Sequence, residues 1–269
     1  MIFRSAKEVL TEIWQNRTRM LRIVWYDIKI ENRSLYLGTF WKILSPLIQL
    51  GTFWFVFGIG IRGGAPIDGY PFLVWLVAGL VPWFFINRSI TTGAMSISSK
   101  AGMVFKIKFP IATIPVGSII HRLYDHIVMM GILIVIFLAH GIFPSIYWLN
   151  LLYYLLFLFV FLSALAMVVS VLVQLAKDFG KLITSLLQLV FFLTPIIWQI
   201  DNVPDWAQSV LFVNPVLYVV DGYRHALLFQ ISFFERPQLM VFFWGVTLVL
   251  LLIGCYLQRK YATRFVDWM

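Results

Sequence analysis

The sequence predicts an all-α integral membrane protein that forms a single domain over residues 1–269. Its parts are an N-terminal amphipathic interfacial helix, six transmembrane helices, and an outer re-entrant helix pair before the last span. Three observations predict this fold. Hydrophobic residues make up 61% of the chain and charged residues 12%, about half the share of roughly 25% in a soluble domain. The mean hydropathy is +0.88, and a soluble domain cannot bury so much apolar surface. The charged residues also leave four intervals of 19 to 22 residues and one of 51 residues free.

Residues 1–31 are predicted to form the amphipathic helix. Apolar residues at Ile2, Ala6, Val9 and Ile13 recur at intervals of three and four, the period of one helix face. The charged residues of this segment fall off that face. Such a helix lies along the inner leaflet of a membrane or packs on a partner protein, and the two arrangements are compatible.

The charge-free intervals predict the spans, because a helix of about 20 apolar residues crosses a bilayer and satisfies its own backbone hydrogen bonds. The interval of 51 residues contains the turn signature Gly141–Ser145 and therefore reads as two spans. We expect the six spans at residues 43–61, 69–87, 119–140, 148–173, 182–200 and 238–258.

Residues 203–230 are predicted to dip into the outer leaflet without crossing it. Only 15 charge-free residues separate Asp205 from Asp221, and Asn214-Pro215 interrupts them. Trp206 and Arg224 belong to the same segment. The alternative is a seventh span, which would place the basic C-terminus on the opposite side from the basic N-terminus.

The distribution of Lys and Arg favours six spans with both termini in the cytoplasm. This topology places 17 of the 21 basic residues on the cytoplasmic side, Arg88 among them, and three on the outer side. Arg122 remains in a span. With Asp125 and His126 it predicts an intramembrane ion pair, because residues three and four apart share a helix face. Anchoring of the helix is the favoured role of this pair, and a proton relay is the alternative.

Motifs for catalysis are absent from the sequence. No G-x-x-x-x-G-K-[ST], C-x-x-C, H-E-x-x-H or G-x-S-x-G pattern occurs. We therefore expect no catalytic residue, no metal site and no cofactor in this chain, so that ATP and Mg²⁺, if used, bind a separate ATPase. The apolar loop 91–110, which lysines interrupt, suits a short helix docked on such a partner, and we expect the shorter loop 177–181 to touch the same partner. The candidate docking residues are Ser99, Lys100, Met103, Phe105, Lys106, Lys108, Lys177 and Asp178.

Four motifs in order carry a resemblance to a known family. They are Leu37-Gly38-x-x-Trp41, Lys106-x-Lys108-Phe109-Pro110, Leu193-Thr194-Pro195, and Asn214-Pro215 with Asp221-Gly222-x-Arg224. Together they resemble the membrane subunit of type-2 ABC exporters, which move cell-surface polysaccharides. The segments 32–38 and 81–87 look most like the teichoic-acid export permeases of Gram-positive bacteria.

The resemblance implies that two copies of this chain pair with two ATPase subunits. It implies that the first and fifth spans line a lateral route for wall teichoic acid carried on undecaprenyl diphosphate, with membrane lipids around it. Because the predicted spans hold only Arg122 as a fixed positive charge, we expect a hydrated route with aromatic walls. The candidate pathway residues are Trp41, Phe53, Trp54, Phe191, Phe192 and Trp198.

Three alternatives remain open at this stage. The cargo is a lipid-linked polysaccharide of the capsule or O-antigen type, or the chain is a membrane-embedded glycan transferase, or it is a secondary carrier. A transferase needs convergent carboxylates, and the outer candidates Asp201, Asp205, Asp221 and Glu235 match no recognised spacing. A secondary carrier normally has repeated halves and ionisable groups near the midplane, and neither is evident here. No feature predicts a nucleic-acid partner.

Overall fold

The computed structural model describes residues 2–33, 40–100, 102 and 109–261, and this part of the chain is built from helices. The predicted all-helical membrane fold is therefore confirmed. Short 3-10 and π segments extend several helices, for example the π-helix Trp54–Ile61, which completes the first span. The α-helices are α1 (Ile2–Gln15), α2 (Arg17–Arg33), α3 (Trp41–Phe53), α4 (Phe72–Ser99), α6 (Thr113–Ala139), α7 (Asn150–Leu175), α8 (Asp178–Leu193), α9 (Asp205–Leu211), α10 (Pro215–Arg224) and α11 (Pro237–Tyr261).

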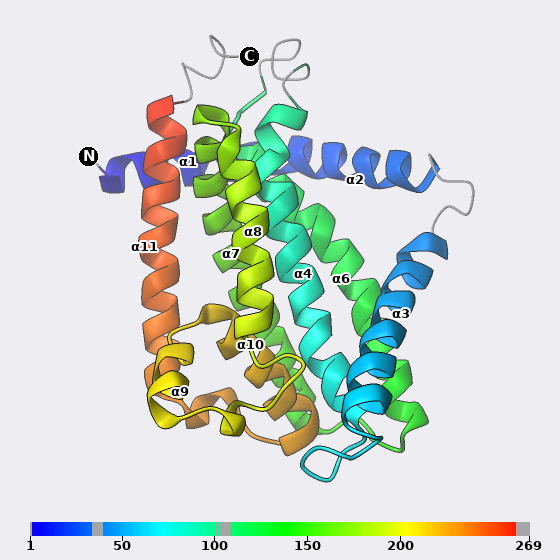
Figure 1. Cartoon of the computed structure of the whole chain (residues 1–269). Helices are drawn as coiled ribbons and strands as arrows, with labels where there is room; N and C mark the ends of the chain where they lie inside the picture. The colour runs from blue at the N-terminus through cyan, green and yellow to red at the C-terminus, as the bar shows by residue number, and fades with distance from the viewer. Residues whose placement is uncertain (1, 34–39, 101, 103–108, 262–269) are drawn as a thin grey trace.

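Five helical segments of the described chain are long and apolar enough to cross a membrane, so length does not confirm the predicted count of six. These segments are Trp41–Ile61, Phe72–Ser99, Thr113–Ala139, Ile146–Leu175 and Pro237–Tyr261. The predicted span 182–200 is instead α8, which begins at Asp178 and ends at Leu193. At 16 residues it is about 24 Å long, and it leads from the end of the bundle near α1 toward α9 and α10 (Figure 1).

Pro195 explains why α8 ends early. A proline disfavours the helical conformation of the preceding residue, and Thr194 accordingly adopts φ −80° and ψ 132°. The five residues after Thr194 form an irregular turn rather than the predicted helix.

Helix α4 is longer than the predicted span 69–87 and takes up residues of the predicted loop 91–110. It continues to Ser99, and its hydroxyl groups bond within the helix, for example Thr91 Oγ1 to Asn87 O at 2.8 Å. Because most of α4 is buried among other helices, its last turns do not need an apolar sequence. Arg88, which the sequence places in the cytoplasm, therefore lies within a spanning helix.

The bundle is organised around α4, which packs against α6, α7, α8 and α10. Helix α11 packs on α7, whereas α3 leans away from the bundle at its edge and leaves much of its apolar surface exposed (Figure 1). The predicted amphipathic helix is two helices, broken at Asn16, that lie across one end of the bundle (Figure 1). Helix α1 packs on α11 and α2 packs on α6. We call this the α1–α2 end, and the opposite one the α9–α10 end.

The interfacial helices bury one face and expose the other. Val9, Met20 and Val24 are buried against the bundle, whereas Trp14 and Trp25 are exposed. The structure thus shows that the amphipathic pattern serves packing on the chain's own bundle and leaves two indole rings exposed on its other side, each under a basic side chain of the same helix pair. The end of α11 lies at the same end of the bundle, since Arg259 Nε is 3.1 Å from Glu8 Oε2 of α1.

The contact between α7 and α10 depends on a glycine. A Cβ atom at Gly222 of α10 would lie 2.2 Å from two ring atoms of Tyr154, a buried aromatic residue of α7. A rigid ring in a close-packed site cannot move aside. We expect Gly222→Ala to lower the free energy of unfolding by about 2 kcal/mol, within the usual range for overpacking, and thermal unfolding of the purified protein measures this.

Gly131 of α6 is the matched control, because a Cβ atom there meets nothing within 4 Å. Gly131→Ala should leave the unfolding temperature unchanged or raise it. Equal effects of the two substitutions would show that the α7–α10 contact is not tight.

Candidate functional site

A groove of about 460 Å³ runs between α3, α4 and α8. Helix α4 forms its floor and the other two helices form its walls, with α4 between them in Figure 1. The lining residues repeat at helical spacing on each element, which places them on one face. They are Gln49 and Phe53 of α3, Trp83, Phe84, Asn87 and Arg88 of α4, and Thr184, Leu187, Gln188 and Phe191 of α8.

One part of the groove is aromatic. The ring of Phe191 lies 5.4 Å from that of Phe53 and 5.3 Å from that of Trp83, measured between ring centres. Phe191 thus bridges the two walls and the floor. Tilted rings at this distance attract one another and offer apolar faces to a ligand.

The other part of the groove is polar. Within the described chain, the side chains of Gln49, Asn87, Arg88 and Gln188 have no hydrogen-bond or ion-pair partner, whereas Thr184 Oγ1 donates to Gly180 O at 3.0 Å. Unpaired polar groups in hydrocarbon cost several kcal/mol each. The groove is therefore suited to water or a polar ligand and unsuited to lipid chains.

The structure brings two of the six candidate pathway residues into this groove, namely Phe53 and Phe191. Trp41, Trp54 and Phe192 do not line it, and Phe192 is 55% exposed on another face of α8. Trp198 lies beyond α8, where its Nε1 donates to Phe192 O at 3.0 Å.

Sequence reasoning missed the floor of the groove and its polar wall. The signal was present as polar and aromatic residues four apart, with Trp83 followed by Asn87, and Thr184 followed by Gln188. This spacing puts each pair on one helix face. It could not show that the two faces meet.

Ionic side chains join α2, α3 and α6 near the α1–α2 end. Lys42 Nζ of α3 lies 2.9 Å from Asp125 Oδ1 of α6 and 3.8 Å from Glu31 Oε2 of α2. Arg122 is 2.7 Å from Asp125 Oδ2 and 3.5 Å from Glu31 Oε2. His121 Nε2 lies 2.7 Å from the same Glu31 oxygen. We call these five residues the ionic cluster.

The cluster keeps Glu31 ionised. The hydrogen bond from His121, aided by the positive charges of Arg122 and Lys42, outweighs burial and lowers the pKa of Glu31 to about 2. The candidate His126 is not part of the cluster. It turns to the other side of α6, where its Nε2 lies 3.0 Å from Tyr223 Oη and its ring stacks on Phe85.

The candidate docking residues gather at the α1–α2 end as far as they are described. Lys177 and Asp178 are exposed in the α7–α8 turn, and Ser99 ends α4. The Lys100 side chain forms an ion pair with Asp27 of α2, so it ties α4 to the interfacial helix. The candidates Met103, Phe105, Lys106 and Lys108 lie outside the described residues.

At the α9–α10 end, Asn214 and Arg224 hold the short helices on the bundle. Asn214 caps α10 through Val216 N at 2.9 Å and donates to Thr194 Oγ1 at 2.8 Å. Arg224 is only 4% exposed and donates to Pro195 O at 2.7 Å and Ile196 O at 2.9 Å. The candidate Trp206 on α9 is instead 73% exposed.

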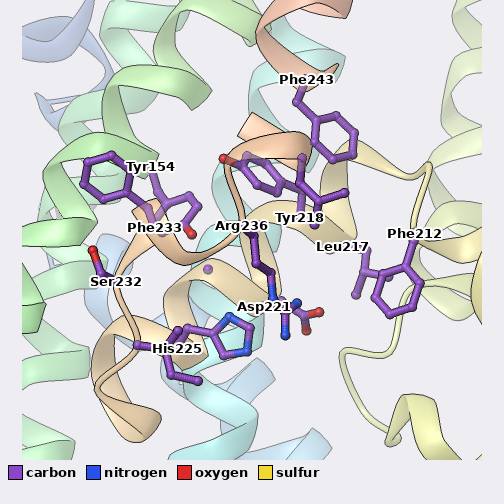
Figure 2. Close-up of a pocket in the computed structure, with 13 residues that line it drawn as sticks. Tyr154, Phe212, Leu217, Tyr218, Asp221, His225, Ser232, Phe233, Arg236 and Phe243 are labelled. Atoms are coloured by element: carbon purple, nitrogen blue, oxygen red, sulfur yellow. The ribbon is translucent and has the colours of Figure 1, made fainter. Parts of the chain in front are cut away.

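Two small cavities lie beside these helices. In the first, Asp221, His225 and Arg236 converge with Tyr154 and Phe233 around them (Figure 2), but its volume of about 20 Å³ admits roughly one water molecule. An adjoining cavity of about 270 Å³ shares the three polar residues. No group of three or more His, Cys, Asp or Glu in the described ranges is placed to hold a metal ion.

The fold and the groove together define a multi-pass helical membrane protein, with several unpaired polar side chains in a groove between two spanning helices and α8. A family model described as ABC-2 type transporter matches residues 18–228, and the chain belongs to that family. This agrees with the type-2 exporter resemblance of the sequence motifs.

Three curated relatives are similar to the chain over most of their length. The O-antigen export system permease protein RfbA of Myxococcus xanthus is 24% identical over 80% of this chain and 82% of its own length. The protein of the same name from Klebsiella pneumoniae is 22% identical over 90% and 91%. The polysialic acid transport protein KpsM of Escherichia coli is 24% identical over 87% and 89%.

Proposed function

We propose that this chain is the membrane-spanning subunit of an ATP-driven exporter of a lipid-linked surface polysaccharide, of the O-antigen or capsule type. The groove between α3, α4 and α8 carries this proposal, because it combines aromatic rings with unpaired amides between two spanning helices and α8. Sugar rings offer apolar faces to aromatic side chains and hydroxyl groups to amides. Membership of the ABC-2 family supports a separate ATPase partner.

The cargo is assigned to the O-antigen or capsule type because the curated relatives carry those names. The teichoic-acid assignment depends on the segments 32–38 and 81–87 alone, and it is the less supported reading. In either case the lipid is expected to be undecaprenyl diphosphate.

In this proposal the polymer slides through a hydrated groove and binds its walls weakly. One copy of the chain provides only two walls and a floor, and α3 exposes a large apolar face at the edge of the bundle. A second copy would close the route, and two ATPase subunits would dock at the α1–α2 end, where Lys177 and Asp178 are exposed.

The same proposal fixes the orientation in the bacterial cytoplasmic membrane. The α1–α2 end faces the cytoplasm and the α9–α10 end faces outward, because the basic residues gather at the first. Labelling of single cysteines at Gln15 and at Gln208, in a Cys255→Ser background, tests this with a reagent that does not cross membranes. Only Gln208→Cys should react in intact cells.

The groove itself is tested by removing its central ring. We expect Phe191→Ala to lower polymer export about tenfold, because Phe191 contacts both Phe53 and Trp83, and a lost stacking contact is worth about 1 kcal/mol or more. Surface polysaccharide in cells that lack the native gene measures the effect.

Phe242→Ala is the matched control, since Phe242 is an exposed aromatic residue of α11 that does not line the groove. It should export normally. Complementation of strains that lack an O-antigen, a capsule or a teichoic-acid permease identifies the cargo. Normal export by Phe191→Ala, at equal protein levels, would refute the groove as the route.

A further inference from the structure

Arg88 is an unpaired positive charge inside a spanning helix. It lies 16 residues after the start of α4 and 11 before its end, which is about 24 Å and about 16 Å along the axis. Charged groups within spanning helices are costly and normally pair with one another. Within the described chain, Arg88 makes no hydrogen bond and no ion pair, and its side chain lines the groove.

The other buried or half-buried basic residues of the bundle have partners. Arg122 and Lys42 belong to the ionic cluster. Arg224 donates to two carbonyl groups, and its Cζ atom lies 3.4 Å from the ring centre of Trp75. Helix anchoring therefore accounts for these three residues but not for Arg88.

The neighbours of Arg88 are hydrogen-bond donors without carboxylates. Asn87, Gln49 and Gln188 line the same groove, and among the described residues no Asp or Glu lines it. A guanidinium beside three amides is suited to bind an oxyanion with several acceptor oxygens, and phosphate fits the planar fork of arginine in two-point contact. An anion reaches this depth of a bilayer most readily when an apolar chain carries it.

We propose that Arg88, with Asn87, Gln49 and Gln188, forms a binding site for the phosphate group of a lipid, at which the lipid-linked glycan is held in the groove. This inference rests on the proposed function and names the chemical group that the groove recognises. In this arrangement the aromatic part of the groove around Phe191 contacts the sugar, and the polar part binds the phosphate. The sequence pattern by itself places Arg88 on the cytoplasmic side and leaves Arg122 as the only fixed positive charge in the predicted spans.

The test measures binding by the purified full-length complex in nanodiscs. The probes are a long-chain polyprenyl diphosphate, the same polyprenol without phosphate, and inorganic diphosphate. We expect Arg88→Gln to weaken binding of the polyprenyl diphosphate by about tenfold to a hundredfold, the loss typical of one charge-assisted contact. Arg88→Lys should retain most of the affinity, and binding of the polyprenol should not change.

Binding of inorganic diphosphate distinguishes a lipid headgroup from free phosphate as the natural ligand. Weak binding of inorganic diphosphate, at least a hundredfold below the lipid, assigns the site to a lipid headgroup. Tight binding of inorganic diphosphate that Arg88→Gln abolishes overturns the lipid assignment in favour of free phosphate. Equal binding of the polyprenyl diphosphate by wild type and Arg88→Gln overturns the site altogether.

Two controls keep this result separate from the proposed function. Arg62→Gln removes an arginine that lies outside the groove and should not alter binding. Export by Phe191→Ala cells reports on the groove as a route, whatever Arg88 does. If Phe191→Ala blocks export and Arg88→Gln binds normally, the function stands and the phosphate site fails.

Discussion

Replacement of Arg224 by alanine is expected to abolish export and to lower the free energy of unfolding by about 3 kcal/mol. The side chain is buried, donates to Pro195 O and Ile196 O, and stacks on Trp75. Removing it leaves two carbonyl groups unpaired, and hydrogen bonds to a charged donor contribute about 1.5 to 3 kcal/mol each. The turn after α8 would then separate from α4 and take α10 with it.

Thermal unfolding of the purified protein measures the loss of stability, and an export assay in cells measures the loss of export. Arg62→Ala is the control, because Arg62 makes a single longer bond, 3.3 Å to Gln199 Oε1, nearby. Arg62→Ala should lower the free energy of unfolding by less than about 1 kcal/mol. Arg224→Lys should recover little, since an ammonium group cannot make both bonds and stack. Full export by Arg224→Ala would mean that the turn is held by other contacts.

Asp125→Asn is the second substitution from which we expect a large effect. The two carboxylate oxygens of Asp125 lie less than 3 Å from Lys42 Nζ and from a guanidinium nitrogen of Arg122. The side chains of Asp125 and Lys42 are both almost completely buried. Neutralising it leaves one positive charge of the cluster uncompensated, and breaking a buried ion pair on one side costs about 3 to 5 kcal/mol. Helix α3 would lose its tie to α6, and the groove would lose the position of one wall.

The double variant Asp125→Asn with Lys42→Met removes both members of the pair and restores the charge balance. We expect it to regain at least half of the lost unfolding free energy, because replacing both partners is far less costly than replacing one. Glu8→Gln is the exposed control and should cost less than about 1 kcal/mol. A double variant as unstable as the single one would show that Lys42 and Asp125 do not act as a pair.

The difference between Phe191 and Phe192 shows what helix rotation adds to sequence. Both aromatic residues are candidates by composition, and they are adjacent in the chain. Successive residues of a helix point about 100° apart, so only one of them faces the groove. Hydropathy locates α8 along the chain, although it places the start four residues and the end seven residues too late, and it carries no information on which face meets α4.

Arg88 shows that hydropathy is similarly limited in predicting where a spanning helix ends. A charge ends a predicted span because lipid cannot solvate it, so the hydropathy pattern predicts residue 87 as the last. In the structure this part of α4 contacts other helices and lines a groove. Protein contacts tolerate Arg88 and the serines and threonines after it, so the helix continues for another 11 residues.

The sequence by itself determined the class of the protein, the order of its apolar helices, the amphipathic start and the short helix pair near Asn214-Pro215. Each depends on the partition of a contiguous segment between water and hydrocarbon, or on backbone restriction by proline, and both effects are local in the chain. The tertiary structure decided which polar groups meet. The pairs Lys42–Asp125 and Arg224–Pro195 are 83 and 29 residues apart, and the groove draws on three helices, because such contacts depend on how helices rotate and pack rather than on their composition.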